Sequence, residues 1–93
     1  MKVRNMESSS GNTIANQFII SDTENDFQVE YFQSYDSIIA KKLYKGISEI
    51  TLDRHYWNYS VTTSKYRNLF LGETKKETQA KIDSGEYQLV DLN

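Results

Sequence analysis

The chain has 93 residues and a net charge of −2, and it contains seven Tyr, four Phe and one Trp but no Cys and no Pro. This length is enough for one small domain, because two halves could not each bury a core. Without cysteine, disulfide bonds and thiolate metal sites are excluded. We expect a thin core built mainly of aromatic residues and isoleucine, because aliphatic residues are scarce.

Residues 1–16 predict a polar N-terminal arm or loop, and residues 17–93 predict a single α+β domain. The arm carries the run Ser8-Ser9-Ser10-Gly11-Asn12, whereas a signal peptide has an apolar core near its start. No window approaches the roughly 18 apolar residues that a membrane span needs. We therefore expect a cytoplasmic protein.

The first half of the domain predicts strands. The run Phe18-Ile19-Ile20 indicates a strand that ends at Ser21-Asp22, and residues 23–26 indicate a turn. From Phe27 to Tyr31 apolar and polar residues alternate, which is typical of a strand with one wet face. Residues 32–35 continue or bend this strand.

Two neighbouring segments predict a hairpin. Residues 37–43 are compatible with a strand or a short helix, while residues 47–52 more clearly predict a strand. Lys45-Gly46 lies between them, and glycine readily adopts the positive φ of a tight connection. This neighbour favours a strand for residues 37–43.

A helix is predicted after residue 60. Thr62 or Thr63 is expected to cap its N-terminus. Tyr66 and Phe70 are four residues apart and form an apolar stripe, and Gly72 stands where a C-terminal cap is expected.

A second helix and a last strand complete the chain. Thr74-Lys75-Lys76-Glu77 fits a capping box, so this helix is expected to run to about Ser84 and to be closed by Gly85. Residues 87–92 predict a strand. The predicted fold is α+β: a small antiparallel β-sheet of four to five strands with two short helices packed on one face, in the order βββ(β)ααβ.

Charge is distributed unevenly along the chain. Five acids, with no Lys or Arg among them, lie between residues 21 and 36: Asp22, Glu24, Asp26, Glu30 and Asp36. Residues 54–81 contain six bases and two acids, a net charge of +4. These segments are either solvated surfaces or the two ends of a dipolar molecule that is steered onto a charged partner.

No constellation of residues proposes a reaction. His55 is the only histidine, and no second His or Cys is present to complete a metal site with Asp53. The acids of residues 22–26 resemble the start of a calcium loop, but Phe27 and Gln33 stand where such a loop needs Gly and Glu. We expect no enzymatic activity, no cofactor and no metal site.

The segment from His55 to Arg67 combines four large aromatic residues with hydroxyl groups and bases. This mixture is typical of a nucleic-acid surface, where aromatic rings stack on bases, or of a protein interface, where Trp, Tyr and Arg dominate. Trp57, Tyr66 and Phe70 are expected in the core. The residues expected to contact a partner are Tyr56, Tyr59, Lys65 and Arg67. The net charge of −2 argues against a general nucleic-acid binder.

Five segments carry a resemblance to a known family: Asn16–Ile20, Tyr31–Tyr35, Trp57–Arg67, Phe70–Gly72 and Gly85–Tyr87. The most specific is the run Tyr-Ser-x-Thr-Thr-x-Lys-Tyr-Arg of residues 59–67. These segments resemble a family of small proteins carried by phages and mobile elements of bacteria. The resemblance implies an accessory factor of the bacterial cytoplasm, and such factors include anti-CRISPR proteins that occlude an effector nuclease. It implies no catalytic residue.

Two functions are expected on these grounds. In the first, the protein is a non-enzymatic inhibitor of a host defence protein: acidic side chains occupy a basic nucleic-acid groove while the aromatic segment anchors the contact. The acidic contact residues are Asp22, Glu24, Asp26 and Glu30. In the second, the face formed by residues 54–81 binds nucleic acid. A third interpretation is an assembly accessory, because edge strands and exposed tyrosines suit a homodimer.

Overall fold

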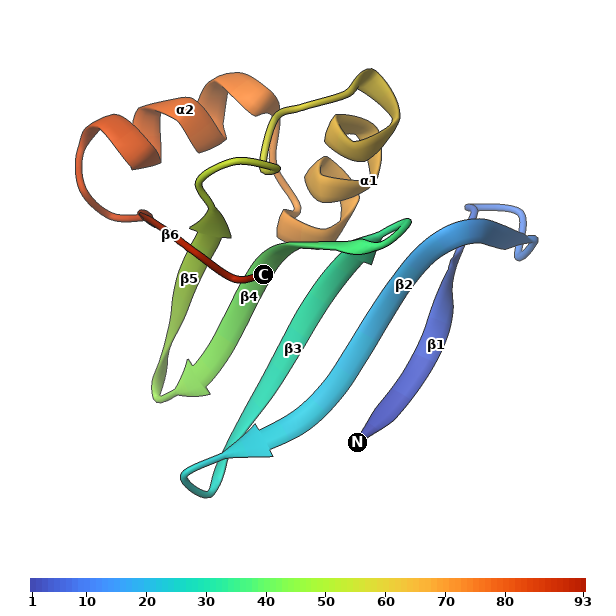
Figure 1. The fold of residues 1–93 in the computed structure, drawn as a ribbon, viewed down its shortest axis with the longest axis horizontal. Coiled ribbons are helices and arrows are strands. Elements are labelled where there is room, and N and C mark those ends of the chain that lie inside the picture. Colours follow the sequence, from blue (N-terminus) through green and yellow to red (C-terminus); the bar gives the residue numbers. More distant parts are fainter.

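In the computed structural model, which describes residues 1–93, six strands form one sheet in the order of the chain (Figure 1). The strands are β1 (Lys2–Glu7), β2 (Thr13–Glu24), β3 (Phe27–Ser34), β4 (Ser37–Lys45), β5 (Ile47–Asp53) and β6 (Gln88–Val90). Strands β1 to β5 pair as antiparallel neighbours, and β6 pairs in parallel with β5. The sheet is therefore mixed, with β1 and β6 at its edges.

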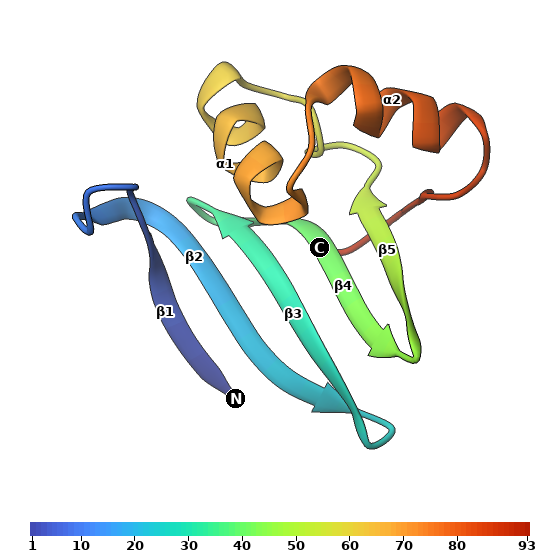
Figure 2. The ribbon, with the colours of Figure 1, turned by 180° about the vertical axis from the view of Figure 1, so that it is seen from behind.

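Two helices, α1 (Val61–Leu71) and α2 (Lys75–Asp83), lie in the chain between β5 and β6. Figures 1 and 2 show both helices over the same end of the sheet, while the β2–β3 and β4–β5 turns lie at the opposite end. The helical connection brings the chain back in its original direction, so β6 enters the sheet parallel to β5. Neither helix is long and apolar enough to cross a membrane.

The structure confirms the α+β class and the order of strands, two helices and a strand, with two corrections. The sheet has six strands rather than four to five, and it is mixed rather than antiparallel. Within the predicted polar arm, residues 2–7 form β1 and β2 already begins at Thr13. Hydrogen bonds between β1 and β2 stabilise both strands, so these polar residues form strands without an apolar periodicity of their own.

The two faces of the sheet carry different side chains. Phe32 of β3 lies directly opposite Ile19 and Ala40, and all three belong to the core beneath the helices. The Phe32 ring stacks on that of Phe70 from α1, with 5.8 Å between their centroids. Because neighbouring residues in a strand point to opposite faces, the apolar alternation of residues 27–31 marks the face that no helix covers.

The core is small and rich in aromatic residues, as expected. Seven buried residues form it: Ile19, Phe32, Ile39, Ala40, Leu52, Phe70 and Tyr87. Trp57 and Tyr66 pack against this cluster and are half-buried. The prediction that Phe70 belongs to the core is confirmed, and Trp57 and Tyr66 lie at the margin of the core.

The start of α1 differs from the prediction by two to three residues. Ser60 caps the helix: its Oγ accepts a hydrogen bond of 3.1 Å from the backbone N–H of Thr63. Thr63 is itself fully buried, and its hydroxyl lies 2.9 Å from that of Ser34 at the end of β3. This contact joins α1 to the sheet.

The other helix ends agree with the predictions. Gly72 adopts a left-handed conformation with φ of 70° and closes α1. Thr74 and Glu77 form the expected capping box, with hydrogen bonds of 3.0 and 3.2 Å. Residues 37–43 lie in β4, and Gly46 has a φ of 77° in the β4–β5 turn.

Candidate functional site

The loop between β5 and α1 is held by one buried carboxylate, that of Asp53. Its Oδ2 accepts hydrogen bonds of 3.0 Å from the backbone N–H groups of both His55 and Tyr56. Its Oδ1 accepts a bond of 2.8 Å from the N–H of Leu92, in the C-terminal segment after β6. Asp53 therefore fixes the first half of the loop and ties it to the C-terminal segment.

The ionisation of Asp53 reflects these contacts. Burial opposes the charge, but hydrogen bonds from the Leu92 N–H, the Asn93 side chain and the N–H groups of His55 and Tyr56 outweigh it. They hold the pKa of this carboxyl below its ordinary value. At neutral pH the loop is therefore organised around a full negative charge.

Two tyrosines and a valine form an exposed surface on this loop and at the start of α1. The rings of Tyr56 and Tyr59 meet edge to face, with centroids 5.3 Å apart. Tyr56 is 36% exposed, Tyr59 47% and Val61 88%. We call these three residues the aromatic surface. Edge-to-face packing restricts both rings, so the tyrosine pair is ordered before any partner arrives.

Arg67 lies beneath this loop, which corrects the expectation that it contacts a partner. Its side chain is fully buried, with 0% exposure. The guanidinium donates to the backbone carbonyl of Trp57 and to the side chains of Ser64 and Asn68, and it lies 5.2 Å from the Trp57 ring centre. Arg67 thus fastens the loop to α1 from below.

The guanidinium of Arg67 has no carboxylate within ion-pair distance. Burial lowers its pKa from the ordinary value, and the charge of Glu73 opposes this shift. Arginine stays protonated even in such a site, because its ordinary pKa is above about 12. Carbonyl and hydroxyl dipoles together with the Trp57 ring compensate the charge, which makes the loop conformation depend on this residue.

Lys65 is placed as expected, on the exposed face of α1 one turn after Val61. Its ammonium lies 5.3 Å from the centre of the Tyr66 ring. Other bases of the predicted basic segment are neutralised: Arg54 is 3.0 Å from Asp91, and Lys81 is 2.8 Å from Glu73. The structure therefore does not present residues 54–81 as one basic face.

Three of the predicted acidic contacts, Asp22, Glu24 and Asp26, lie at the β2–β3 hairpin, at the end of the sheet opposite the helices (Figure 1), and Glu30 lies further along β3. Glu24 pairs with Lys41 at 2.8 Å. Glu30 lies 4.0 Å from Arg4 and accepts a hydrogen bond of 2.8 Å from the hydroxyl of Tyr44.

These acids do not form one surface. Asp22 lies opposite Val29 in the register, on the face that no helix covers, whereas Glu30 points to the helix side. Asp26 occupies the β2–β3 turn with a φ of 68°. Asp22, Glu24 and Asp26 therefore lie at the end of the molecule opposite the aromatic surface, whereas Glu30 lies on the helix side of the sheet.

One exposed aromatic residue at the helix end was missed by the sequence reasoning. Tyr35 occupies the tight β3–β4 turn with a φ of 55° and is half exposed. The preceding residue, Ser34, contacts Thr63 of α1, which brings the turn to the same end as the aromatic surface. The dipeptide Tyr35-Asp36 between two strand-like runs was the available signal for a turn.

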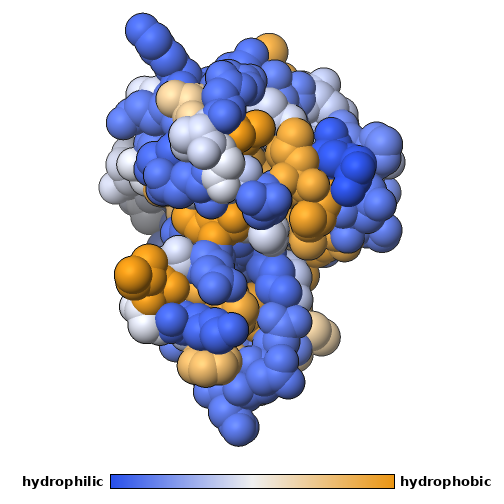
Figure 3. All heavy atoms as spheres, turned by 90° about the vertical axis from the view of Figure 1, so that its left-hand side faces the viewer, coloured by the Kyte–Doolittle hydropathy of each residue, from blue (hydrophilic) through white to orange (hydrophobic).

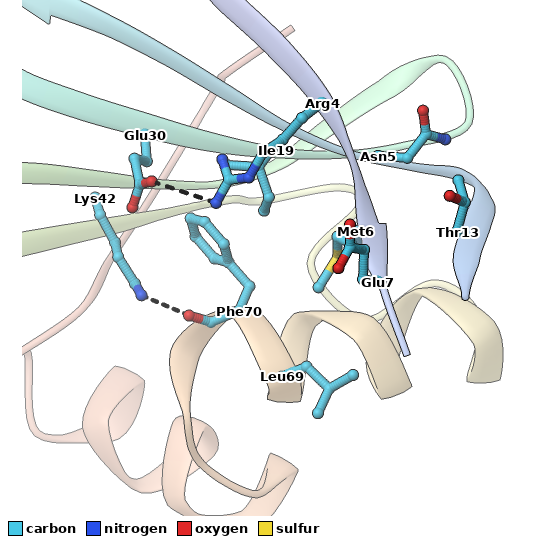
Figure 4. A pocket seen from close by; sticks show the side chains of 10 residues that line it. All are labelled: Arg4, Asn5, Met6, Glu7, Thr13, Ile19, Glu30, Lys42, Leu69 and Phe70. Atoms are coloured by element: carbon cyan, nitrogen blue, oxygen red, sulfur yellow. Dashed lines mark hydrogen bonds and ion pairs between the residues drawn. The ribbon is translucent and has the colours of Figure 1, made fainter. Parts of the chain in front are cut away.

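A groove separates β1 from the C-terminal half of α1 and has a volume of about 640 Å³ (Figure 4). It is lined by Arg4, Asn5, Met6, Glu7, Thr13, Ile19, Glu30, Lys42, Leu69 and Phe70. Lys42 donates to the backbone carbonyl of Phe70 and lies over its ring, and burial lowers the pKa of this lysine. The sequence offered no sign of the groove, because its walls come from separate parts of the chain.

Figure 3 shows the side that carries α2, β5 and β6, where hydrophobic atoms lie in several groups between hydrophilic ones. The structure contains no group of three or more His, Asp or Glu residues that could hold a metal ion. His55 is exposed, and its Nε2 lies 3.7 Å from Asp91.

The fold and this surface define a small α+β domain with an ordered aromatic surface at one end. The chain belongs to DUF8033, a family of unknown function, whose sequence pattern matches residues 1–86. Comparisons with curated proteins and with solved structures gave no match.

Proposed function

We propose that this protein works by binding a protein partner through the aromatic surface, without catalysing a reaction. The observation that carries the proposal is the exposed, edge-to-face pair of Tyr56 and Tyr59 on a loop fixed by buried Asp53 and Arg67. Tyrosine is enriched among residues that dominate binding energy at interfaces. An ordered loop loses little conformational entropy on binding, which raises affinity.

The proposed partner is a bacterial host defence protein, such as a CRISPR effector nuclease that this protein occludes in the cytoplasm. The support is the resemblance of residues 59–67 to small proteins of phages and mobile elements. Asp26 at the other end of the molecule has no ion pair and contributes long-range attraction to a basic partner. Asp22 lies 3.8 Å from the N-terminal ammonium of Met1, which partly offsets its charge. Glu24 and Glu30 are already engaged by Lys41 and Tyr44, so their contribution is smaller.

The test compares binding by matched variants. The wild-type protein, a Tyr56→Ala/Tyr59→Ala double variant and an Ile47→Ala control are immobilised and exposed to a bacterial lysate at moderate salt. Ile47 is a suitable control because it is highly exposed and begins β5 at the opposite end of the sheet. A partner captured by wild type and control, but lost by the double variant, supports the proposal.

The specific inhibitory role needs a second assay. The captured partner is purified, and its nuclease or nucleic-acid-binding activity is measured with and without the protein. Inhibition by wild type but not by the double variant is expected. If the folded double variant captures and inhibits the partner as wild type does, the aromatic surface is not the site.

Nucleic acid remains a second candidate partner because of one observation. Tyr56 and Tyr59 are exposed on the loop before α1 and Lys65 is exposed on α1, and such aromatic groups stack on bases of single strands. The burial of Arg67 and the pairing of Arg54 with Asp91 count against it. A gel-shift experiment with single-stranded DNA and RNA decides: an absence of binding even at low salt excludes this function, because low salt favours phosphate contacts.

A further inference from the structure

Strand β1 is an unpaired edge of the sheet. It spans Lys2–Glu7, it pairs only with β2, and nothing lies along its other side (Figure 1). Along an edge, alternate residues direct their backbone N–H and C=O groups away from the sheet. The outer side of β1 is therefore a row of donors and acceptors available to another extended chain.

The groove described above opens directly beside this edge. Four consecutive residues of β1, Arg4 to Glu7, contribute to its lining, and Leu69 of α1 forms part of the opposite wall (Figure 4). Met6 and Ile19 give it an apolar interior, and Leu69 is 58% exposed. Its volume of about 640 Å³ is within the usual range of ligand sites.

Bases predominate in the first half of β1 on the groove side, while Glu7 lines the groove at the other end of the strand. Lys2 lies opposite Ser21 and Arg4 opposite Ile19, so both bases point to the face on which the groove opens. Lys2 has no ion pair, and the only acidic contact of Arg4 is Glu30 at 4.0 Å. An added strand with acidic residues opposite these two positions would be stabilised by cross-strand attraction.

We infer that β1 accepts an extended segment of a protein partner as an additional strand, with an apolar side chain in the groove and acidic side chains opposite Lys2 and Arg4. This is the known mode in which a sheet edge provides main-chain hydrogen bonds and a pocket selects side chains. The site is distinct from the aromatic surface and does not depend on the proposed function. It defines a second contact of the same molecule.

The same charges disfavour a second copy as the occupant. In an antiparallel pair of two β1 strands related by a two-fold axis, side chains of the same face stand opposite one another. A pair centred on Val3 sets Lys2 against Arg4 of the other copy, and a pair centred on Arg4 sets the two Arg4 side chains against each other. Like charges directly opposite are destabilising, so both of these registers are disfavoured. An acidic segment of another protein meets no such repulsion.

The probe is a synthetic peptide of the sequence Ser-Leu-Thr-Glu-Val-Glu-Ser, acetylated, amidated and fluorescently labelled. In antiparallel pairing its Leu reaches the groove beside Met6, its two Glu residues stand opposite Arg4 and Lys2, and its Val lies beside Val3. Binding is measured by fluorescence anisotropy with the full chain. We expect saturable binding, with amide chemical-shift changes along β1.

Peptide variants test strand pairing without altering the protein. N-methyl groups are placed on one peptide nitrogen at a time. Because alternate N–H groups face β1, methylation should abolish binding at every second position and leave the positions between unaffected. Equal tolerance at all positions, or no binding of the parent peptide, overturns the inference.

Protein variants test the charges and the groove. Arg4→Glu should weaken peptide binding about tenfold, since it replaces a cross-strand attraction with a repulsion. Leu69→Ala should also weaken it, because the groove loses apolar contact. The matched controls Lys76→Glu and Ile47→Ala lie on exposed positions of α2 and β5 and should bind as wild type does.

Two outcomes contradict the inference. Unchanged peptide affinity of folded Arg4→Glu and Leu69→Ala shows that the peptide binds elsewhere. Self-association of the protein in light scattering that Arg4→Glu abolishes shows that a second copy occupies the edge.

Discussion

At the scale of single residues, the aromatic surface depends on two buried charged groups. Asp53 accepts hydrogen bonds from backbone N–H groups of the loop and of the C-terminal segment. Arg67 of α1 donates a hydrogen bond to the carbonyl of Trp57 in the loop. Each compensates its charge with polar groups of the main chain or of neighbouring side chains. Removing either leaves buried groups without partners, which is costlier than losing an exposed contact.

Replacing Asp53 by Asn should destabilise the fold by about 1–3 kcal/mol. The neutral amide oxygen accepts hydrogen bonds less strongly than a carboxylate, and the NH₂ group of Asn cannot accept the bonds from backbone N–H groups that the second carboxylate oxygen accepts. Urea unfolding followed by the fluorescence of Trp57, the only tryptophan, provides the measurement. Asp36→Asn is the matched control, since Asp36 is exposed in the β3–β4 turn. Equal stability of both variants would refute the role of Asp53.

The lowered pKa of Asp53 also predicts a pH dependence. A carboxyl whose pKa is lower in the folded state stabilises the fold above the pKa of the unfolded chain, about 4. That contribution is lost as the pH falls through the lower pKa of the folded state. Wild type should therefore lose more stability than Asp53→Asn on acidification below about pH 4. Parallel curves of unfolding free energy against pH would contradict this.

Replacing Arg67 by Ala should cost about 3–5 kcal/mol, as is typical when one partner of a buried charged network is removed. Arg67→Lys should be only partly tolerated, because an ammonium lacks the planar fork that reaches several acceptors. The control is Lys65→Ala, exposed on the same helix, with a change below about 0.5 kcal/mol. A small effect of Arg67→Ala would mean that the loop keeps its shape without the guanidinium.

At the scale of elements, α1 buries polar side chains and exposes apolar ones, which is unusual for a helix that packs on a sheet. It buries Thr63 and Arg67 together with Phe70 and leaves Val61 and Leu69 exposed. Thr63 contacts β3, and Arg67 contacts the loop. The exposed Val61 belongs to the aromatic surface, and the exposed Leu69 lines the groove beside β1. An apolar stripe alone could not reveal this arrangement.

The position of the α1 cap is directly testable. Ser60→Ala should lower the free energy of unfolding by about 0.5–2 kcal/mol, because the N–H of Thr63 loses its acceptor. Thr62→Ala, at the neighbouring exposed position, should change stability by less than about 0.5 kcal/mol. Chemical denaturation of the two variants gives the comparison. The reverse order of effects would restore Thr62 as the cap.

At the scale of the whole molecule, the fold is a single sheet with helices over one end only. Of 93 residues, 14 are buried, so the free energy of unfolding should be modest. The central strands β3 and β4 hold Phe32, Ile39 and Ala40 of the core, whereas β1 is an edge. Stability should therefore decrease from the centre of the sheet toward its edges.

Amide hydrogen exchange measures this gradient residue by residue. Amides of β3 and β4 should exchange most slowly, near the rate set by global unfolding, and those of β1 and β6 fastest among the strands. Addition of the peptide that pairs with β1 should slow exchange in β1 selectively. Uniform protection across all six strands would show that the sheet opens only as a unit.

Much of the local structure followed from the sequence. The alternation of residues 27–31, the capping box at Thr74 and the glycine at residue 72 each predicted what the structure contains, because such signals act between residues close in the chain. The strand β1 was not predicted, because its stability comes from pairing with β2.

The candidate site was predicted in part. Tyr56, Tyr59 and Lys65 are exposed as expected, since polar and aromatic loop residues next to a helix start often remain at the surface. Arg67 is buried, although a charged residue within a polar run of the sequence is predicted to be exposed. Its environment is formed by Trp57 from the loop, and spacing in the sequence does not show that contact.

The sequence by itself determined the α+β class, the order of the elements and the concentration of aromatic residues between His55 and Phe70, because propensity, periodicity and caps are local properties. Only the tertiary structure decided that Arg67 supports the loop, that the acidic hairpin lies far from the aromatic surface, and that β6 runs parallel to β5. These features depend on which distant residues meet. That is settled by packing and by the compensation of buried charges.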